Sequence, residues 1–226
     1  MRWKMYYHNG ILKESIGERI VQAAIFFVSG WGMIKKNDLK LLFRLDEKEY
    51  IDMKHHLHQT RRCYTLEINT DGDIYAMPHE GYQPAKKYIN VLSVFAQLMQ
   101  RHKDEEIQIS SETHSTLFLA EMLIRKKDGT IQTYHALDTA FYSLPFYALQ
   151  DALESEIADW NDRKNHRIII VVYPETDVWH LDIDFPVFFA QRKEKNQLFD
   201  FFNNDRVPKE REVEIWKSPY VTQDKY

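Results

Sequence analysis

Hydrophobic side chains recur with helical spacing along the N-terminal third of the chain. Residues 17–28 carry them at positions 20, 23, 24, 27 and 28, which is typical of a helix with one buried face. A second helix is expected over 37–45, with Asn37 as its N-terminal cap. Its inward face consists of Leu39, Leu42 and Phe43. The pattern therefore predicts two helices before residue 46.

A third helix is expected to begin at Glu47. Asp46 can accept hydrogen bonds from the first turn, and Glu49 can accept from the backbone N–H of Asp46, which together form a capping box. Its apolar flank comprises Tyr50, Ile51, Met53 and Leu57. Its basic character comes from Lys48, Lys54, His55, His58, Arg61 and Arg62. Only a tight turn separates this helix from the second one, which is helix-turn-helix spacing.

A hairpin is expected next. Residues 63–68 alternate between polar and apolar positions, and an Asn-Thr-Asp-Gly turn separates them from a second strand at 73–77. The order of three helices and a hairpin predicts a winged helix over residues 17–78. The hairpin tip carries Asp71 and Asp73 and no Lys or Arg, so we expect it to pack structurally or contact protein rather than phosphate.

The rest of the chain is expected to form a second part. The segment 79–84 has the composition of a linker, and 85–102 form a helix whose apolar face belongs to a core or, as the alternative, to a dimer interface. Strands are expected at 107–110, 116–124, 130–137, 167–173 and 178–184, with a helix at 146–160 and partly helical structure at 187–202.

These elements predict an α+β protein, with an N-terminal winged helix-turn-helix followed by a small mixed α/β sheet domain. The run at 167–173 is continuously β-branched, which favours a strand covered on both faces. The predicted division has an N-terminal segment (1–16), the winged helix (17–78), a linker and connecting helix (79–104), the α/β domain (105–202) and a charged tail (203–226).

Composition limits the class of protein. The 226 residues are 44% hydrophobic and 28% charged, which is enough to bury a core. A single cysteine, Cys63, excludes an internal disulfide framework and favours a reducing compartment, with the cytoplasm as the default. The N-terminus lacks the apolar core of a signal peptide, and no apolar run approaches the ~18–20 residues that span a bilayer. We therefore expect a cytoplasmic protein without membrane contact.

Charge is distributed unevenly along the chain. The net formal charge is −4, but residues 1–78 hold 12 Lys and Arg against 10 Asp and Glu, whereas residues 79–226 hold 18 against 24. A nucleic-acid interface needs a local positive patch rather than a basic whole, because lysines and arginines neutralise individual phosphates. The basic N-terminal part is thus the candidate for such an interface.

The order of winged helix, connecting helix and sheet domain resembles the replication-relaxation-like winged-helix proteins of plasmids and conjugative elements of Gram-positive bacteria. The resemblance rests on the helices around 39–57, the hairpin at 63–77 and the strands after Thr116. It implies a DNA-associated protein. It gives no support for cleavage, because the acid-x-Lys pattern expected in a nuclease-type sheet is absent: Glu121 is followed by Leu123, and Asp138 by Ala140.

The resulting hypothesis is a non-enzymatic protein without cofactor that binds double-stranded DNA, with the second domain providing oligomer or partner contacts. A homodimer would present two recognition helices to operator half-sites. The expected DNA-binding residues are Lys35, Lys36, Lys40, Lys48, Lys54, His55, His58, Arg61 and Arg62. The main alternative, favoured by the acidic hairpin tip and the negative net charge, is a winged-helix module that binds protein instead of DNA.

Other chemistry has weaker support in the sequence. His55 and His58 could share a metal, although no third ligand is evident nearby. A second alternative is a metal-dependent nuclease in which Asp182 and Asp184 share one strand face. Glu175 or Asp177 would then complete the metal site. Hydrolase residue types are present as Ser110, Ser111, His114 and Asp138, but without a nucleophile elbow. No phosphate-binding glycine loop occurs.

Overall fold

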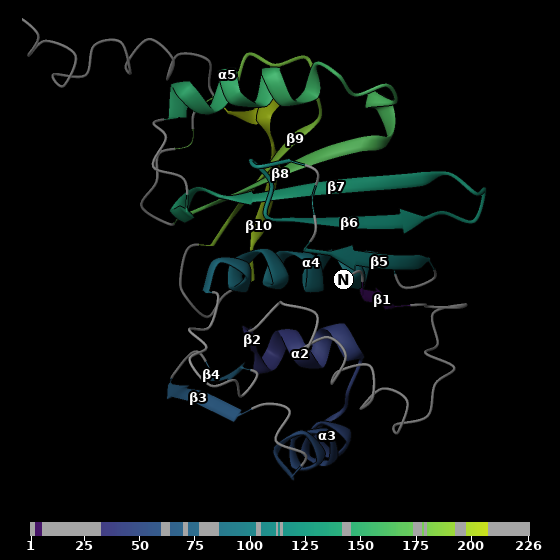
Figure 1. The fold of residues 1–226 in the computed structure, drawn as a ribbon, viewed down its shortest axis with the longest axis vertical. Helices are drawn as coiled ribbons and strands as arrows, with labels where there is room; N and C mark the ends of the chain where they lie inside the picture. The colour runs from purple at the N-terminus through teal and green to yellow at the C-terminus, as the bar shows by residue number, and fades with distance from the viewer. Residues whose placement is uncertain are drawn as a thin grey trace, which may run out of the picture.

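The chain is described here from a computed structural model. The structure describes residues 3–5, 33–59, 64–69, 72–76, 86–102, 105–111, 113, 115–141, 146–173, 178, 180–192 and 198–207. The expected helix at 17–28, the linker at 79–84, Arg61, Arg62, Cys63, Asp71, His114, Glu175, Asp177 and most of the charged tail lie outside these residues. The fold is mixed α+β, with a small antiparallel sheet near the N-terminus and a larger mixed sheet (Figure 1).

The small sheet and two helices form a compact N-terminal unit. Strand β2 (Met33–Lys35) leads directly into α2 (Lys36–Phe43), and α3 (Glu47–Gln59) follows after three residues. Strands β3 (Tyr64–Asn69) and β4 (Gly72–Ala76) form the predicted antiparallel hairpin, and β4 also pairs with β2. The sheet order is therefore β2-β4-β3.

The large sheet has the strand order β1-β5-β6-β7-β8-β9-β10. Its antiparallel half comprises β1 (Trp3–Met5), β5 (Glu106–Ser110), β6 (Ala120–Arg125) and β7 (Ile131–Asp138). Strands β7, β8 (His166–Val172) and β9 (Val187–Gln191) are parallel, and β10 (Asp200–Asn203) pairs antiparallel with β9. Residues 3–5, assigned from sequence to a separate segment, thus add an edge strand to this sheet.

One helix covers each face of the large sheet (Figure 1). On one face, α4 (Ile89–Arg101), preceded by the 3-10 turn Lys86–Tyr88, packs against β7 and β8 and, on its other side, against α2. On the opposite face, α5 (Phe146–Ile157) buries Leu149, Leu153 and Ile157 against alternate residues of β8 and β9. The expectation that β8 is covered on both faces is confirmed, because Ile168 and Ile169 belong to the cores on opposite sides.

Three predicted elements are wrong. The segment 178–184 is not a strand, and the neighbours of β8 are β7 and β9. The described residues of 187–202 form two strands instead of the expected partial helix, since β9 is rich in aromatic and β-branched residues and pairs parallel with the buried β8. The strand expected from 116 begins only at Ala120, because the Ser115 hydroxyl accepts hydrogen bonds from the backbone N–H groups of Leu117 and Phe118 and holds a turn there.

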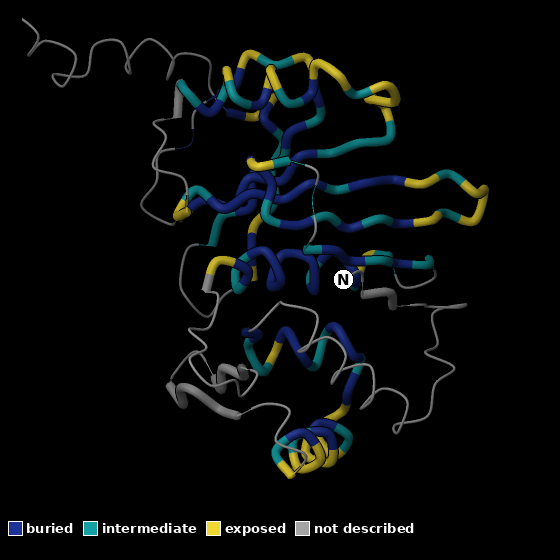
Figure 2. The backbone as a smooth tube through the Cα atoms, in the orientation of Figure 1, coloured by how far each residue is buried: buried dark blue, intermediate teal, exposed yellow. Residues whose placement is uncertain are grey.

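The connecting helix α4 is a core helix. Eight of its thirteen residues are buried, and Figure 2 shows it dark blue along most of its length. Because α2 and the large sheet cover it from two sides, the core alternative considered from the sequence is confirmed for this helix. Among the described residues, no helix is both long enough and apolar enough to cross a lipid bilayer.

Candidate nucleic-acid interface

The start of α3 is fixed by the predicted capping box. Asp46 Oδ1 accepts from the backbone N–H of Glu49 at 2.8 Å, and Glu49 Oε2 accepts from the backbone N–H of Asp46 at 3.0 Å. Two backbone donors that a helix N-terminus leaves unpaired are thereby satisfied. The prediction that the helix begins at Glu47 is confirmed.

The turn between α2 and α3 is made without glycine. Arg44 adopts a left-handed conformation (φ 47°, ψ 52°), and the backbone N–H of Leu45 donates to the carbonyl of Lys40 at 3.0 Å, which closes the end of α2. Leu45 is buried and anchors the turn. The predicted cap is wrong: Asn37 lies inside α2, and Lys35 occupies the cap position without a side-chain hydrogen bond.

One stripe of α3 attaches it to the protein and leaves the opposite face in solvent. Tyr50, Met53 and Leu57 are buried. The exposed residues are Glu47, Lys48, Ile51, Asp52, His55, His56 and Gln59. Ile51 was expected on the apolar flank but is 50% exposed, because its position on the helix turns it away from the buried stripe. Lys54 and His58 are half-buried and each makes a contact within the protein.

Two lysines expected to anchor phosphate are paired with an acid of α3. Lys40 Nζ lies 2.6 Å from Glu47 Oε2, and Lys36 Nζ lies 3.4 Å from Glu47 Oε1. Both ammonium groups also approach the ring of Tyr50, at 4.8 Å for Lys36 and 6.0 Å for Lys40. The hydrogen bonds from Lys40 and then Lys36 lower the pKa of the Glu47 carboxyl below its ordinary value.

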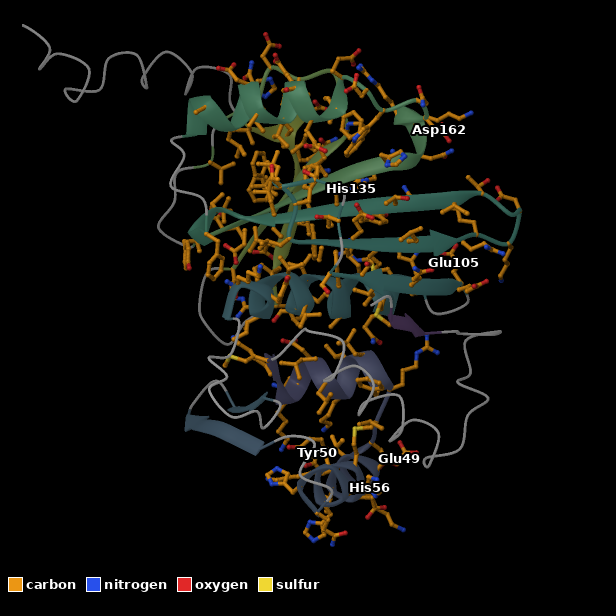
Figure 3. All side chains as sticks on the ribbon, in the orientation of Figure 1. Glu49, Tyr50, His56, Glu105, His135 and Asp162 are labelled. Atoms are coloured by element: carbon orange, nitrogen blue, oxygen red, sulfur yellow. The ribbon has the colours of Figure 1, made fainter. Side chains whose placement is uncertain are left out.

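These pairs leave the described surface of the two helices nearly neutral. Residues 36–59 contain five Lys and Arg and five Asp and Glu. Lys35, the last residue of β2, is half-buried and lies within electrostatic reach of Asp38. The structure therefore brings together Lys36, Lys40 and Lys48 around the start of α3, with His55 one to two turns further along the same helix (Figure 3 labels Glu49, Tyr50 and His56 there).

The proposed metal-dependent nuclease site is not formed by the described residues. Asp182 and Asp184 are exposed and lie in a segment without strand structure, so they do not share a strand face. The backbone N–H of Asp182 donates to Gln150 Oε1 at 3.0 Å, which ties this segment to α5. Within the described part of the chain, no group of three or more His, Cys, Asp or Glu side chains is arranged to hold a metal ion.

The hydrolase residue types lie on opposite faces of the large sheet. Ser110 is in register with Glu121, and Glu121 with His135, so these three side chains share the α5 face. Asp138 lies on the α4 face, where its Oδ2 accepts from Asn90 Nδ2 at 2.9 Å and its Oδ1 from the backbone N–H of Ala140 at 3.0 Å. Ser110 and Asp138 therefore cannot act together.

Side chains of helix α4 bind two buried carboxyl groups, those of Asp38 and Asp138, and only Asp138 was singled out from the sequence. Ser93 donates a hydrogen bond to Asp38 of α2, and Asn90, one turn earlier, donates to Asp138 of β7. Burial raises the pKa of both carboxyl groups above their ordinary value, although these hydrogen bonds act in the opposite direction. Arg192, at the end of β9, lies within electrostatic reach of both acids. The two parts of the protein thus meet through polar as well as apolar contacts.

A second group missed from sequence lies on the α5 face. His135 Nε2 is 2.8 Å from His166 Nδ1, and His135 Nδ1 faces Glu121 Oε1 at 3.4 Å. The Trp160 ring contacts both imidazoles in tilted orientations, with ring centroids 4.3 Å from His135 and 4.8 Å from His166. The three polar residues come from neighbouring strands and are up to 45 residues apart in sequence, so only the alternation in β6 and β7 hinted that Glu121 and His135 share a face.

Trp160 also lines a surface pocket of about 590 Å³. The other lining residues come from the C-terminal half of α5, from the residues just after it, and from the turn before β6: Thr116, Leu117, Ala152, Ser155, Glu156 and Asp159. The pocket is thus close to the histidine pair and lies on the far side of the large sheet from α2 and α3 (Figure 1).

No family model matches this chain, and no curated protein or solved structure shows detectable similarity to it. The functional interpretation therefore depends on the connectivity of the N-terminal unit, on the exposed face of α3 and on the charges around it.

Proposed function

We propose that this chain is a winged-helix protein that binds double-stranded DNA through α3. The observation that carries the proposal is connectivity: α2 and α3 lie between β2 and β3, and the sheet order is β2-β4-β3. In a winged helix the strand before the helix pair joins the hairpin that follows it, which gives this order. The three-residue connection between the helices has helix-turn-helix length.

The outward face of α3 has the dimensions and side chains for groove contact. Thirteen residues make a helix of roughly 20 Å, and the major groove of B-DNA admits an α-helix. Lys48 can contact guanine or phosphate, Gln59 can pair with the edge of adenine, and Ile51 can contact the methyl group of thymine. His55 lies between them on the exposed face. We place this face, rather than the acidic hairpin tip, against the bases.

The charge balance predicts a binding mode in which DNA phosphates take the place of the Glu47 carboxylate as partners of Lys36 and Lys40. Lys36 and Lys40 are next to α3, and they can contact the phosphate backbone of DNA only by breaking their ion pairs with Glu47. Arg61 and Arg62, which follow α3 in the sequence, add two further positive charges. Non-specific binding should therefore be modest at physiological salt and should fall as salt rises, because each phosphate contact releases counterions.

The large sheet domain is proposed to serve oligomer or partner contacts in a cytoplasmic, non-enzymatic protein. The resemblance in layout to replication-relaxation-like proteins supports a place on a plasmid or conjugative element, in regulation, replication or transfer. The acid-x-Lys arrangement of nuclease-type sheets does not occur on β6 or β7, which supports a role without cleavage.

The proposal is tested by fluorescence anisotropy of a labelled random-sequence duplex over a range of salt concentrations. We expect micromolar-scale binding at low salt and a linear loss of log affinity with log salt. The double variant Lys48→Glu with His55→Glu should weaken binding at least tenfold, because both positions are exposed on α3. The matched control, Lys164→Glu, changes an exposed lysine near α5 and should bind as the parent does. Arg61→Glu with Arg62→Glu should also weaken binding without unfolding the protein.

A second candidate function is protein recognition by the same helix. Ile51 is half exposed in the middle of the α3 surface, and the two helices carry no net charge. If the parent does not bind duplex DNA even at low salt, the DNA proposal fails. A pull-down in which Ile51→Asp loses a protein that the parent retains would then support the protein-interaction function.

A further inference from the structure

A carboxylate and two imidazoles lie in line across three strands of the large sheet, and a hydrogen bond joins the two imidazoles. Glu121 is on β6, His135 on β7 and His166 on β8. Glu121 faces His135 Nδ1 at 3.4 Å, and His135 Nε2 meets His166 Nδ1 at 2.8 Å. His135 is 5% exposed and is enclosed by the rings of Phe118 and Trp160. The arrangement places a carboxylate, a buried imidazole and a second imidazole in line.

The order of these groups determines which nitrogen carries each proton. The Nδ1 atom of His135 makes no hydrogen bond to the described residues, but the negative charge of Glu121 lies 3.4 Å away and favours a proton on that atom. His135 Nε2 must then be the acceptor in the 2.8 Å contact, and the donor is His166 Nδ1–H. Of the four imidazole nitrogens of His135 and His166, the one whose lone pair remains unused is therefore His166 Nε2.

The Nε2 atom of His166 is available to a ligand. This atom makes no hydrogen bond to the described residues. If it were also buried, it would be a buried polar atom without a partner, and it is not one of these. It is therefore in contact with solvent. Burial of the ring, followed by the neighbouring His135, lowers the pKa of His166, which favours the neutral form at pH 7. The atom can act as a base or nucleophile in that form.

We propose that His166 is an activated nucleophile that accepts an acyl group from an uncharged donor. Glu121 and His135 act as positioning residues, in the way a carboxylate and a histidine activate a serine hydroxyl. The surroundings favour an uncharged and partly apolar donor. Residues 146–162 contain five Asp and Glu and no Lys or Arg, which disfavours anions, while Trp160, Leu117 and Ala152 give the adjacent pocket an apolar wall.

The reaction balances without a further oxidant or cofactor. His166 Nε2 attacks the carbonyl carbon, a C–N bond forms, and the C–O bond to the leaving alkoxide or carboxylate breaks. As positive charge develops on His166, its Nδ1 proton moves to His135 Nε2, and the resulting imidazolium is stabilised by Glu121. The leaving group takes a proton from solvent, and the acyl group remains on His166, so the step is a modification of this residue rather than a catalytic cycle.

The test uses diethyl pyrocarbonate, an uncharged acylating reagent, with the full-length protein and peptide mass spectrometry. His55 and His56, which are exposed on α3, serve as internal references for intrinsic imidazole reactivity. We expect His166 to be modified at least as fast as these references despite its partial burial. Ethoxycarbonylation of His166 should consume the reagent with release of carbon dioxide and ethanol.

The decisive variant is Glu121→Gln, which keeps the side-chain shape but removes the negative charge that favours a proton on His135 Nδ1. Without this charge the proton is no longer held on His135 Nδ1, so in a larger share of molecules His135 Nε2–H donates to His166 Nδ1 and the lone pair on His166 Nε2 is lost. We expect modification of His166 to slow roughly tenfold or more relative to His55 and His56. Nitrogen-15 NMR should show the tautomer of both histidines change.

The matched control is Glu105→Gln, because Glu105 pairs with the single histidine His102 at 2.5 Å and lies outside the chain of three groups. It should leave His166 unchanged. The proposal is overturned if His166 in the folded parent is modified more slowly than His55 and His56, or if Glu121→Gln leaves its relative rate and the tautomers unchanged. Thermal unfolding of each variant reports whether the fold is retained.

Discussion

Helices α3 and α4 have the same length and opposite environments. Each has thirteen residues, but α3 buries three side chains along one stripe whereas α4 buries eight. In Figure 2, α3 is yellow over much of its outer surface and α4 is almost continuously dark blue. A helix that is apolar on all sides belongs inside a protein, and one with a single apolar stripe presents its other face to solvent or to a partner.

The difference in burial indicates a structural role for α4 and a binding role for α3. Helix α4 joins the two parts of the molecule, since it contacts α2 on one side and the large sheet on the other. Helix α3 reaches the rest of the protein through Tyr50, Met53 and Leu57 and leaves its opposite face exposed. Substitutions on α4 should therefore change stability, and substitutions on the outer face of α3 should change binding.

The largest expected effect is loss of a core aromatic side chain from α4. Phe95 is fully buried, so Phe95→Ala removes its packing and leaves a cavity between α4 and its neighbours. We expect the free energy of unfolding to fall by about 3–5 kcal/mol, measured by urea denaturation. The control is Ile51→Ala on α3, which should change stability by less than about 0.5 kcal/mol. Equal losses for the two variants would show that α3 and α4 do not differ in the way proposed.

The next largest effect is on the pH dependence of stability, through the carboxyl group of Asp138, which Asn90 of α4 contacts. Burial raises the pKa of Asp138 above its ordinary value of 3.8, so the folded protein binds this proton more tightly than the unfolded chain does. Stability should therefore fall as pH rises from about 4 through the raised pKa. Asp138→Asn cannot ionise, and Asn90 can turn its amide to offer an oxygen, so the variant should gain stability relative to the parent as pH increases.

The carboxyl group at the start of α3 should behave in the opposite way. The lysines lower the pKa of Glu47, so its contribution to stability is present above its ordinary value of 4.5 and is lost as pH falls through the lowered one. Urea denaturation of the parent, Asp138→Asn and Glu47→Gln between pH 3 and 8 tests both signs. A stability difference for Asp138→Asn that is constant with pH would rule out a raised pKa at this site.

The third effect is on DNA affinity. Glu47→Gln removes the carboxylate that holds Lys36 and Lys40, at 3.4 and 2.6 Å, and frees both for phosphate. We expect binding to the random duplex to strengthen, and the slope of log affinity against log salt to steepen by up to about 2, since each phosphate contact contributes roughly 0.9. Fluorescence anisotropy measures both.

Glu49→Gln is the matched control, because Glu49 Oε2 accepts from the backbone N–H of Asp46 in the capping box, whereas Lys36 and Lys40 pair with Glu47. It should leave the salt slope unchanged. If the parent binds DNA and Glu47→Gln has the parent's affinity and slope, then the two lysines are outside the interface while the role of the rest of α3 stands.

Elements fixed by neighbouring residues were the ones that the sequence predicted. Asp46 and Glu49 are three residues apart, so their capping box and the first residue of α3 were predicted correctly. The same holds for the hairpin of β3 and β4, whose turn is only a few residues long. Pairing between distant segments carries no such local signal. The edge strand β1 pairs with β5 more than 100 residues later, and the histidine pair joins two strands separated by α5.

The segment 178–184 shows why alternation alone was misleading. Leu181 is buried and Asp182 is exposed, as in a strand, but the backbone of Leu181 is paired with a side chain instead of a neighbouring strand. Asn204 Oδ1 accepts from Leu181 N at 2.8 Å, and Asn204 Nδ2 donates to Leu181 O at 2.7 Å. An asparagine 23 residues away thus satisfies the groups that a sheet would otherwise pair, and the described residues Asp182 and Asp184 do not share the strand face on which the candidate metal site was built.

The smallest expected effect is at the turn between α2 and α3. Arg44 has a positive φ of 47°, a conformation that costs a residue with a Cβ atom about 1–2 kcal/mol and that glycine adopts freely. Arg44→Gly should relieve this cost, but glycine also makes the unfolded chain more flexible, which offsets part of the gain. We expect a net stabilisation of a few tenths to about 1 kcal/mol, measured by urea denaturation.

Arg44→Ala isolates the backbone contribution, because it removes the same side-chain contacts as glycine but keeps the Cβ atom in the left-handed conformation. The glycine variant should therefore be more stable than the alanine variant, whatever the arginine side chain contributes in the parent. If alanine is equally stable, the left-handed turn carries no backbone strain. DNA affinity should be similar in the two variants, because both keep the short connection that places α3 against α2 and leaves its outer face exposed.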